Sequence, residues 1–200
     1  MQLHFSRMSM NIREASVSDL EAVLAVERAA FGGEEEAELT RALLEDPSAR
    51  PCLSLLAMED ERAVGHVLFT AARVVSQQIS QQKEKQETVL AVLLAPLAVV
   101  PEYQRQGVGS GLVAEGFRRL AAMGVELVFV LGSPEYYSRF GFVPAGALGF
   151  EAPYVLPEKW AEAWRVRSLS SNLLDSNIIG NVSGKVICAD AISKPEFWQE

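Results

Sequence analysis

The stretch at residues 89–120 constrains the fold more than any other part of this sequence. It begins with an almost wholly apolar run, residues 89–100, which is rich in valine and leucine. Such a run is typical of a strand that is buried on both faces of a sheet. Pro96 lies inside the run and cannot donate a hydrogen bond to a neighbouring strand. We therefore expect this central strand to break or bulge at Pro96.

A glycine-rich turn follows the central strand and opens a helix. The turn at residues 104–111 contains three glycines, and apolar side chains then recur at helical spacing until Gly124 ends the helix. The first N–H groups of a helix have no partner within it, so a strand, a glycine turn and a helix start together predict an anion site. The alternative interpretation is a glycine-rich helix start that binds nothing.

We compare the turn at residues 104–111 with three sequence patterns of phosphate-binding loops. A P-loop is excluded because no Lys followed by Ser or Thr comes after the glycines. The dinucleotide fingerprint G-x-G-x-x-G fits Gly107 and Gly109, but Leu112 stands at its third glycine and Glu126 begins a strand rather than ending one. The remaining pattern is Q-x-x-G-x-G, which Gln104, Gly107 and Gly109 match directly after a buried strand.

Composition narrows the class of protein. The chain has 200 residues, 49% of them hydrophobic and 22% charged, which indicates one globular domain with a proper core. Its net charge of −8 and the lack of a basic cluster argue against nucleic acid as a partner and favour a cationic amine substrate. No apolar run is long enough to span a bilayer, so we expect no membrane association. Cys52 and Cys188 lack metal or redox spacing, which predicts a cytoplasmic protein without a metal site.

Other elements precede and follow the central stretch. Ser18 and Glu21 form a predicted capping box that opens the first helix. The polar, glutamine-rich residues 76–88 predict an exposed loop. Strands and helices are expected, in chain order, over residues 11–15, 20–31, 34–45, 52–58, 63–75, 125–131 and 134–140. The expected domain covers residues 10–169, after a disordered lead at 1–9 and before an extension of uncertain structure at 170–200.

The sequence resembles the GNAT superfamily of acyl-CoA-dependent N-acetyltransferases. The resemblance rests on the Q-x-x-G-x-G turn and on Tyr137-Ser138-Arg139-Phe140-Gly141-Phe142, which matches the Tyr-x-x-x-Gly-Phe that ends a short helix in this family. It covers roughly residues 11–144. It implies an α/β (α+β) fold in which a mixed, twisted sheet is splayed at the central strand and flanked by helices.

The resemblance also implies an activity. Family members transfer an acetyl group from acetyl-CoA, or another acyl group from its acyl-CoA, to a primary amine by direct attack in a ternary complex. Tyr137 matches the general acid, and its phenol, with a pKa near 10, is protonated at neutral pH. Tyr136 is expected to be a core aromatic residue. The positions that match the cofactor-binding residues are Leu97, Ala98, Val99, Gln104, Arg105, Gln106, Gly107, Val108, Gly109 and Ser110.

Several functional questions stay open at the level of sequence. The general base is His66, Glu27 or a chain of water molecules, because a histidine titrates near neutral pH and a carboxylate on an apolar helix face is unusual. The acceptor is a small-molecule or peptide amine, and a homodimer is compatible with the sequence. The alternatives to an enzyme are a non-catalytic acyl-CoA-binding regulatory module and a nucleotide-binding protein.

Overall fold

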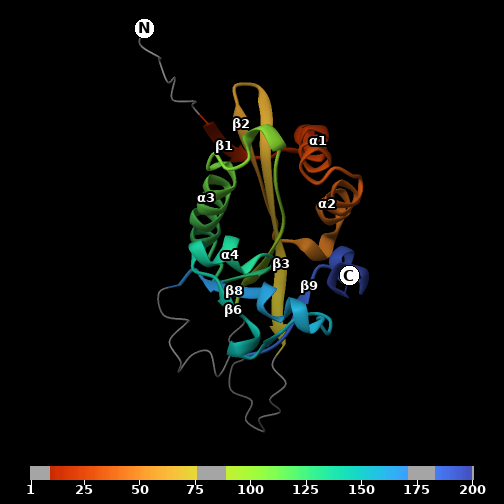
Figure 1. Cartoon of the computed structure of the whole chain (residues 1–200), viewed down its shortest axis with the longest axis vertical. Helices are drawn as coiled ribbons and strands as arrows, with labels where there is room; N and C mark the ends of the chain where they lie inside the picture. Colours follow the sequence, from red (N-terminus) through yellow and green to blue (C-terminus); the bar gives the residue numbers. More distant parts are fainter. Residues whose placement is uncertain (1–9, 76–88, 171–182, 200) are drawn as a thin grey trace.

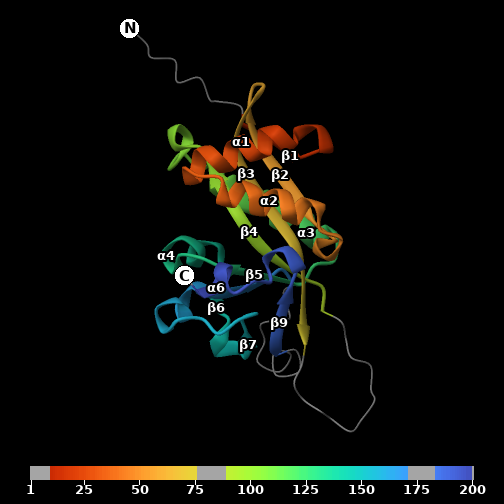
Figure 2. The ribbon, with the colours of Figure 1, turned by 90° about the vertical axis from the view of Figure 1, so that its right-hand side faces the viewer.

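The computed structural model describes residues 10–75, 89–170 and 183–199. In this part of the chain nine strands form one mixed sheet with helices on both faces (Figures 1 and 2). The strands follow the order β1-β2-β3-β4-β5-β8-β6, and β9 pairs with both β3 and β7. Their bounds are β1 Met10–Glu14, β2 Leu53–Glu59, β3 Arg62–Val75, β4 Ala91–Val99, β5 Leu127–Leu131, β6 Val143–Pro144, β7 Phe150–Glu151, β8 Trp164–Ser168 and β9 Gly184–Cys188.

The helices come before, between and after groups of strands along the chain. Those of α type are α1 Leu20–Phe31, α2 Glu35–Glu45, α3 Val108–Ala122, α4 Pro134–Tyr137 and α6 Glu196–Gln199. Short 3-10 turns connect them: η1 Val17–Asp19, η2 Pro47–Ala49, η3 Pro101–Tyr103, η4 Ser138–Phe140, η5 Gly146–Leu148, η6 Glu158–Ala163 and η7 Asp190–Ile192. The predicted α/β class, with a mixed sheet flanked by helices, is confirmed.

The sheet splits beside its central strand. β4 runs parallel to β5 over only three residue pairs, Ala91–Leu93 with Leu127–Phe129, but it continues antiparallel to β3 as far as Val99. The β3–β4 register shifts between Val67 and Phe69, which places the predicted bulge around Pro96. Beyond Leu93 no described strand pairs with β4 on the β5 side, so the sheet opens there.

Two hydrophobic layers hold the helices on the sheet. On the face that α3 covers, Phe69 packs into the space left by Gly116, where an added Cβ would lie 2.4 Å from the Phe69 ring. On the other face, Leu68 and Leu43 join a second layer. Alternation along β3 therefore points residues 67 and 69 towards α3 and residues 66 and 68 towards α1 and α2.

The first helix is capped by a different pair from the predicted one. The backbone N–H and the hydroxyl of Ser16 both donate to the Asp19 carboxylate at 2.7 Å, so the capping box is Ser16 with Asp19 and not Ser18 with Glu21. Asp19 is the better partner because Arg13 also binds its carboxylate, at 2.7 Å. Glu21 is exposed and pairs with Arg41 instead.

The C-terminal residues complete the second layer. β9 pairs with the end of β3, from Ala72 to Val75. The Trp198 ring packs on Trp164 at a centroid distance of 5.7 Å, and the Asp46 carboxylate accepts a hydrogen bond from the Ala191 N–H at 2.8 Å. Residues 183–199 are thus built into the sheet and its core. The segments predicted as a disordered lead and a surface loop lie outside the described residues.

Candidate active site

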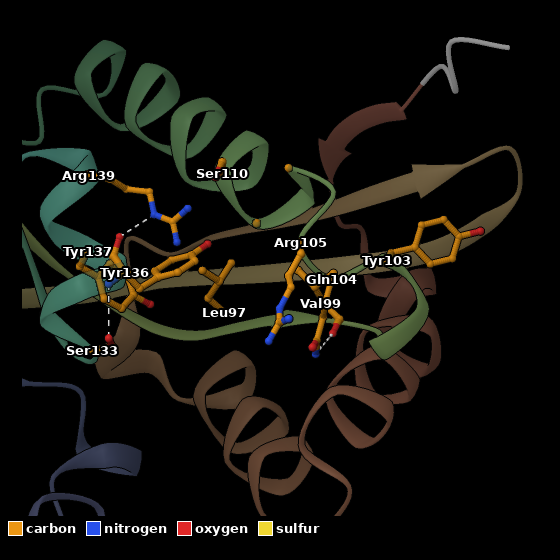
Figure 3. A pocket seen from close by; sticks show the side chains of 12 residues that line it. Leu97, Val99, Tyr103, Gln104, Arg105, Ser110, Ser133, Tyr136, Tyr137 and Arg139 are labelled. Atoms are coloured by element: carbon orange, nitrogen blue, oxygen red, sulfur yellow. Dashed lines mark hydrogen bonds between the residues drawn. The ribbon is translucent and has the colours of Figure 1, made fainter. Parts of the chain in front are cut away.

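A pocket of about 700 Å³ lies at the end of β4 (Figure 3). Its walls are β4, the turn after it, the start of α3, and α4 with the residues next to it. The lining residues are Leu97, Val99, Tyr103, Gln104, Arg105, Gly107, Gly109, Ser110, Ser133, Tyr136, Tyr137 and Arg139.

The glycine turn presents backbone donors to this pocket. Gly107 has a φ of 89°, a left-handed conformation that side chains with a Cβ rarely adopt, and it directly precedes α3. The first bond within the helix runs from the Gly111 N–H to the Gly107 carbonyl at 2.9 Å. The N–H groups of residues 108–110 therefore have no partner within α3, and the helix dipole adds a favourable field for an anion.

Side chains of the turn hold its shape. The Gln104 amide donates to the Val99 carbonyl at 3.0 Å, and the Gln106 amide donates to the Glu102 carbonyl at 2.6 Å. The Tyr103 hydroxyl donates to Glu59 on β2. These bonds tie the turn to itself and to the sheet, which fixes the direction of the backbone N–H groups.

The charged residues of the pocket are both cationic. Arg105 and Arg139 line it, and no Asp or Glu is among the lining residues. The Arg139 guanidinium lies 4.1 Å from the centre of the Tyr136 ring, and its Nε donates to the Tyr136 carbonyl at 2.9 Å. With the helix start, these arginines favour an anionic ligand such as a diphosphate.

Tyr137 projects from α4 into the apolar inner wall. Its side chain is 9% exposed, and its ring contacts Phe142 at a centroid distance of 5.5 Å. Gly132 has no Cβ, and one would lie 2.4 Å from the Tyr137 ring. Burial, together with the neighbouring Tyr136, raises the pKa of Tyr137 well above its ordinary value of 10. The phenol is therefore protonated at neutral pH and can act as a proton donor.

A buried arginine anchors the segment that carries Tyr137. The Arg165 guanidinium, on β8, donates to the Ser138 hydroxyl at 3.0 Å and to the Phe142 carbonyl at 2.8 Å. Ser133 caps the start of α4 by accepting a hydrogen bond from the Tyr136 N–H at 3.3 Å. The short helix α4 is thus fixed at both ends.

Tyr136 has a larger place in the pocket than the sequence suggested. Its ring packs on Tyr137 and Phe140, as expected of a core aromatic residue, but its side chain also lines the pocket (Figure 3). An added Cβ on Gly109 would lie 2.6 Å from the Tyr136 hydroxyl oxygen. The hydroxyl therefore reaches across the pocket to the start of α3.

Most of the predicted cofactor-binding positions lie together. Those that line the pocket are Leu97, Val99, Gln104, Arg105, Gly107, Gly109 and Ser110, and Tyr137 joins them. Ala98 and Val108 are buried, and Gln106 turns its amide back to Glu102. Sequence reasoning missed Tyr103, Tyr136 and Arg139. The spacing of three between Tyr136 and Arg139 on a short helix was the available signal, because it places both side chains on one face.

The two candidate bases lie elsewhere, between α1 and the sheet. Glu27 and His66 are both 0% exposed and do not line the pocket. The Glu27 Oε1 lies 2.5 Å from His66 Nδ1, and His66 Nε2 lies 2.9 Å from the Ser54 hydroxyl. The carboxyl, the imidazole and the hydroxyl thus form one buried chain. Burial is the main reason that the pKa of Glu27 is raised.

Two further observations concern the described residues as a whole. None of their helices combines the length and apolar character that crossing a bilayer requires. Their His, Cys, Asp and Glu side chains form no group of three that could hold a metal ion.

Comparison with known proteins identifies the class and then the family. The fold is similar to that of the GNAT family N-acetyltransferase YhbS from Escherichia coli, whose crystal structure was solved in complex with CoA. That structure matches with a TM-score of 0.76 and 29% identity over 92% of each chain. A family model described as an acetyltransferase (GNAT) domain matches residues 11–145. The chain belongs to the GNAT acetyltransferase family, as the sequence predicted, and the expected acyltransferase class is confirmed with it.

Two other relatives bear on the comparison. The uncharacterized N-acetyltransferase YjhQ of Escherichia coli K12 is 44% identical over 174 residues, which cover 86% of this chain and 88% of the relative. A GNAT acetyltransferase of Brucella melitensis, solved in complex with acetyl-CoA, has a TM-score of 0.65 at 24% identity over 92% of this chain and 99% of its own. The second likeness shows the fold alone.

Proposed function

We propose that the chain transfers an acetyl group from acetyl-CoA to a primary amine by direct attack in a ternary complex. The observation that carries this proposal is the position of the free N–H groups of α3, between two arginines and at the mouth of the split sheet. These groups suit the diphosphate of an acyl-CoA. The YhbS and Brucella structures that share this fold hold CoA and acetyl-CoA, respectively.

The split at β4 suits the rest of the co-substrate. Beyond Leu93 the side of β4 that faces β5 has no strand partner among the described residues, so its backbone groups, apart from the Val99 carbonyl that Gln104 binds, are available to a ligand. Leu97 and Val99 line the pocket there. A well-aimed backbone donor at the thioester carbonyl is worth about 10²–10³ in rate.

Tyr137 is the proposed general acid. The pocket needs a group that gives a proton to the leaving thiolate, and Tyr137 is a lining phenol that is protonated at neutral pH even at its ordinary pKa, which burial raises further. Positioned acids contribute about 10²–10⁴ in rate. The acceptor is a small-molecule or peptide amine.

Thermal unfolding with acetyl-CoA, NAD and ATP in turn tests the cofactor. We expect selective stabilisation by acetyl-CoA that grows with its concentration. A thiol-release assay on a panel of amines, amino acids and peptides then tests transfer. Stabilisation by NAD or ATP but not by acetyl-CoA would overturn the proposal. Stabilisation by acetyl-CoA without release of CoA for any acceptor would favour a non-catalytic acyl-CoA-binding module.

A further inference from the structure

Arg165 is a buried cation whose hydrogen-bond partners among the described residues are all uncharged. Its side chain is 5% exposed, and its guanidinium donates to the Ser138 hydroxyl and to the carbonyls of Phe142 and Glu162. Arginine stays charged in proteins, and a charge that is removed from water without a counter-ion is costly. An apolar side chain of similar volume often serves a core as well or better. The stability of the fold is therefore a poor explanation for this arginine.

Arg165 stands between the two ends of the segment that carries Tyr137. Its backbone faces Val130 of β5 on one side and Pro144 of β6 on the other. Residues 132–142, which include α4 and η4, leave the sheet after β5 and return to it at β6. Figure 1 shows α4 next to β6 and β8. A side chain at this position therefore reaches the middle of the segment from the place where both of its ends meet the sheet.

Two hydrogen bonds of the guanidinium end on the residues that locate the Tyr137 ring. Both come from Nη2, one to the hydroxyl of Ser138, which follows Tyr137, at 3.0 Å, and one to the Phe142 carbonyl at 2.8 Å. The Phe142 ring in turn packs on the Tyr137 ring. A helix as short as α4 is not stable by itself, so these contacts and the Ser133 cap determine where the phenol lies.

We infer that Arg165 is a positioning residue, which holds the Tyr137 phenol where it meets the sulfur of the leaving thiolate. This inference rests on the proposed function, in which Tyr137 is the general acid. Arg165 does not line the pocket, so it acts through the segment and not on the co-substrate itself. Proton transfer needs the acid within hydrogen-bond reach, and a displacement of about 1 Å can lower a rate about 10²-fold.

Arg165→Lys keeps the charge and removes the planar fork, so the lysine cannot hold all three oxygens. With any amine found to be acetylated, we expect kcat to fall about tenfold or more and the KM for acetyl-CoA to stay within about twofold. Arg167→Lys is the matched control. Arg167 lies two positions along β8 and packs over the Phe117 ring at 4.8 Å, so its variant should keep kcat within about twofold.

A double-mutant cycle with Tyr137→Phe separates positioning from a general loss of structure. If Arg165 acts through the phenol, Arg165→Lys should change kcat by less than about twofold in the Tyr137→Phe background. Losses that multiply in the double variant overturn the inference, and so does a kcat of Arg165→Lys equal to that of the wild type. Ser138→Ala removes one of the bonds alone, and the same cycle with this variant serves if Arg165→Lys fails to fold.

Fluorine NMR tests the position of the ring without an acceptor. The chain has four tyrosines, so Tyr137→Phe identifies the signal of Tyr137 in protein labelled with fluorotyrosine. Arg165→Lys should shift this signal, whereas Arg167→Lys should not. An unshifted signal in Arg165→Lys overturns the inference and leaves the proposed function standing. Full kcat in Tyr137→Phe instead contradicts the acid itself, before any Arg165 variant is measured, so the two failures are distinct.

Discussion

The face of the sheet that α3 covers presents main-chain groups to its pocket, whereas the face that α1 and α2 cover presents buried side chains. On the first face the N–H groups at the start of α3 and the unpaired edge of β4 surround the pocket. On the second face Glu27, His66 and Ser54 form a hydrogen-bonded chain within the core.

This difference determines what the sequence can show. A site built from backbone groups needs glycine at positions of special conformation or close approach, such as Gly107 with its φ of 89°. The spacing of these glycines can be recognised in the sequence. A site built from side chains needs residues from distant elements. Glu27 and His66 are 39 positions apart, and only the packing of α1 on β3 brings them together.

The largest expected effect is a fall in kcat. It tests whether the face that α3 covers acts through its main-chain groups alone. Tyr137→Phe removes the proposed proton donor and keeps the ring that packs on Phe142, so kcat should fall by about 10²–10⁴. Affinity for acetyl-CoA should change little, because the turn and α3 are untouched. Steady-state kinetics with any amine found to be acetylated, together with acetyl-CoA titration, measure both quantities.

Tyr136→Phe is the matched control for this variant. It removes one hydroxyl from the adjacent pocket tyrosine, which we expect to affect acetyl-CoA binding more than kcat. Equal kcat values for Tyr137→Phe and wild type would mean that no phenol acts as the acid and that the first face works by backbone contacts and positioning.

A smaller effect, on the KM for acetyl-CoA, is expected where Gly109 and Tyr136 approach each other in the pocket. Gly109→Ala puts a Cβ 2.6 Å from the Tyr136 hydroxyl oxygen, so the tyrosine must move into the space of the ligand. We expect the KM for acetyl-CoA to rise about tenfold, which corresponds to about 1.4 kcal/mol. Because the clash is with one atom, the double variant Gly109→Ala with Tyr136→Phe should recover part of this loss.

A double-mutant cycle measures that recovery. Non-additivity is expected because the two residues touch. Additive losses in KM would show that the added methyl group acts on the ligand directly, and the contact between the two residues would then have no part in binding.

The sequence predicted the fold and the first face for physical reasons. An apolar run with a proline inside it has few structures available, and the bulge near Pro96 was predicted from the missing donor. The splayed sheet was implied by the family resemblance. The turn at Gly107 and the αL end of the short helix at Gly141 were likewise determined locally. The family resemblance gave Tyr137 its expected role, which local pattern alone would not have done.

The features that were not predicted depend on contacts between residues whose proximity cannot be recognised from their spacing in the sequence. Ser16 replaced Ser18 as the helix cap because Arg13, before it in the chain, also binds Asp19. The C-terminal residues could not be placed because β9 pairs with β3, more than 100 positions earlier in the chain. Tyr136 was expected to be a core residue because it adjoins Tyr137 and points to another face of the helix, and the sequence gives no sign that its hydroxyl reaches the start of α3.

The smallest expected effect tests the second face through pH. A carboxyl group whose pKa is raised on folding is stabilised in its protonated form, so its contribution to stability is present below its unfolded pKa of about 4.5 and is lost as pH rises through the folded value. Burial is the first cause of the raised value for Glu27. His66 on β3 opposes it, and Glu36 on α2 adds to it.

Urea unfolding of the wild type and of Glu27→Gln at pH 5 and pH 8 measures this contribution. The free energy of unfolding of the wild type should fall relative to that of the variant as pH rises, by about 1.4 kcal/mol for each unit by which the pKa is raised. Glu35→Gln, which alters an exposed carboxylate of the same region, should follow the wild type. If the wild type and Glu27→Gln instead change in parallel, the Glu27 carboxyl is already satisfied on folding. The second face would then be a structural network, and the contrast between the two faces would lie in how they are built rather than in what they bind.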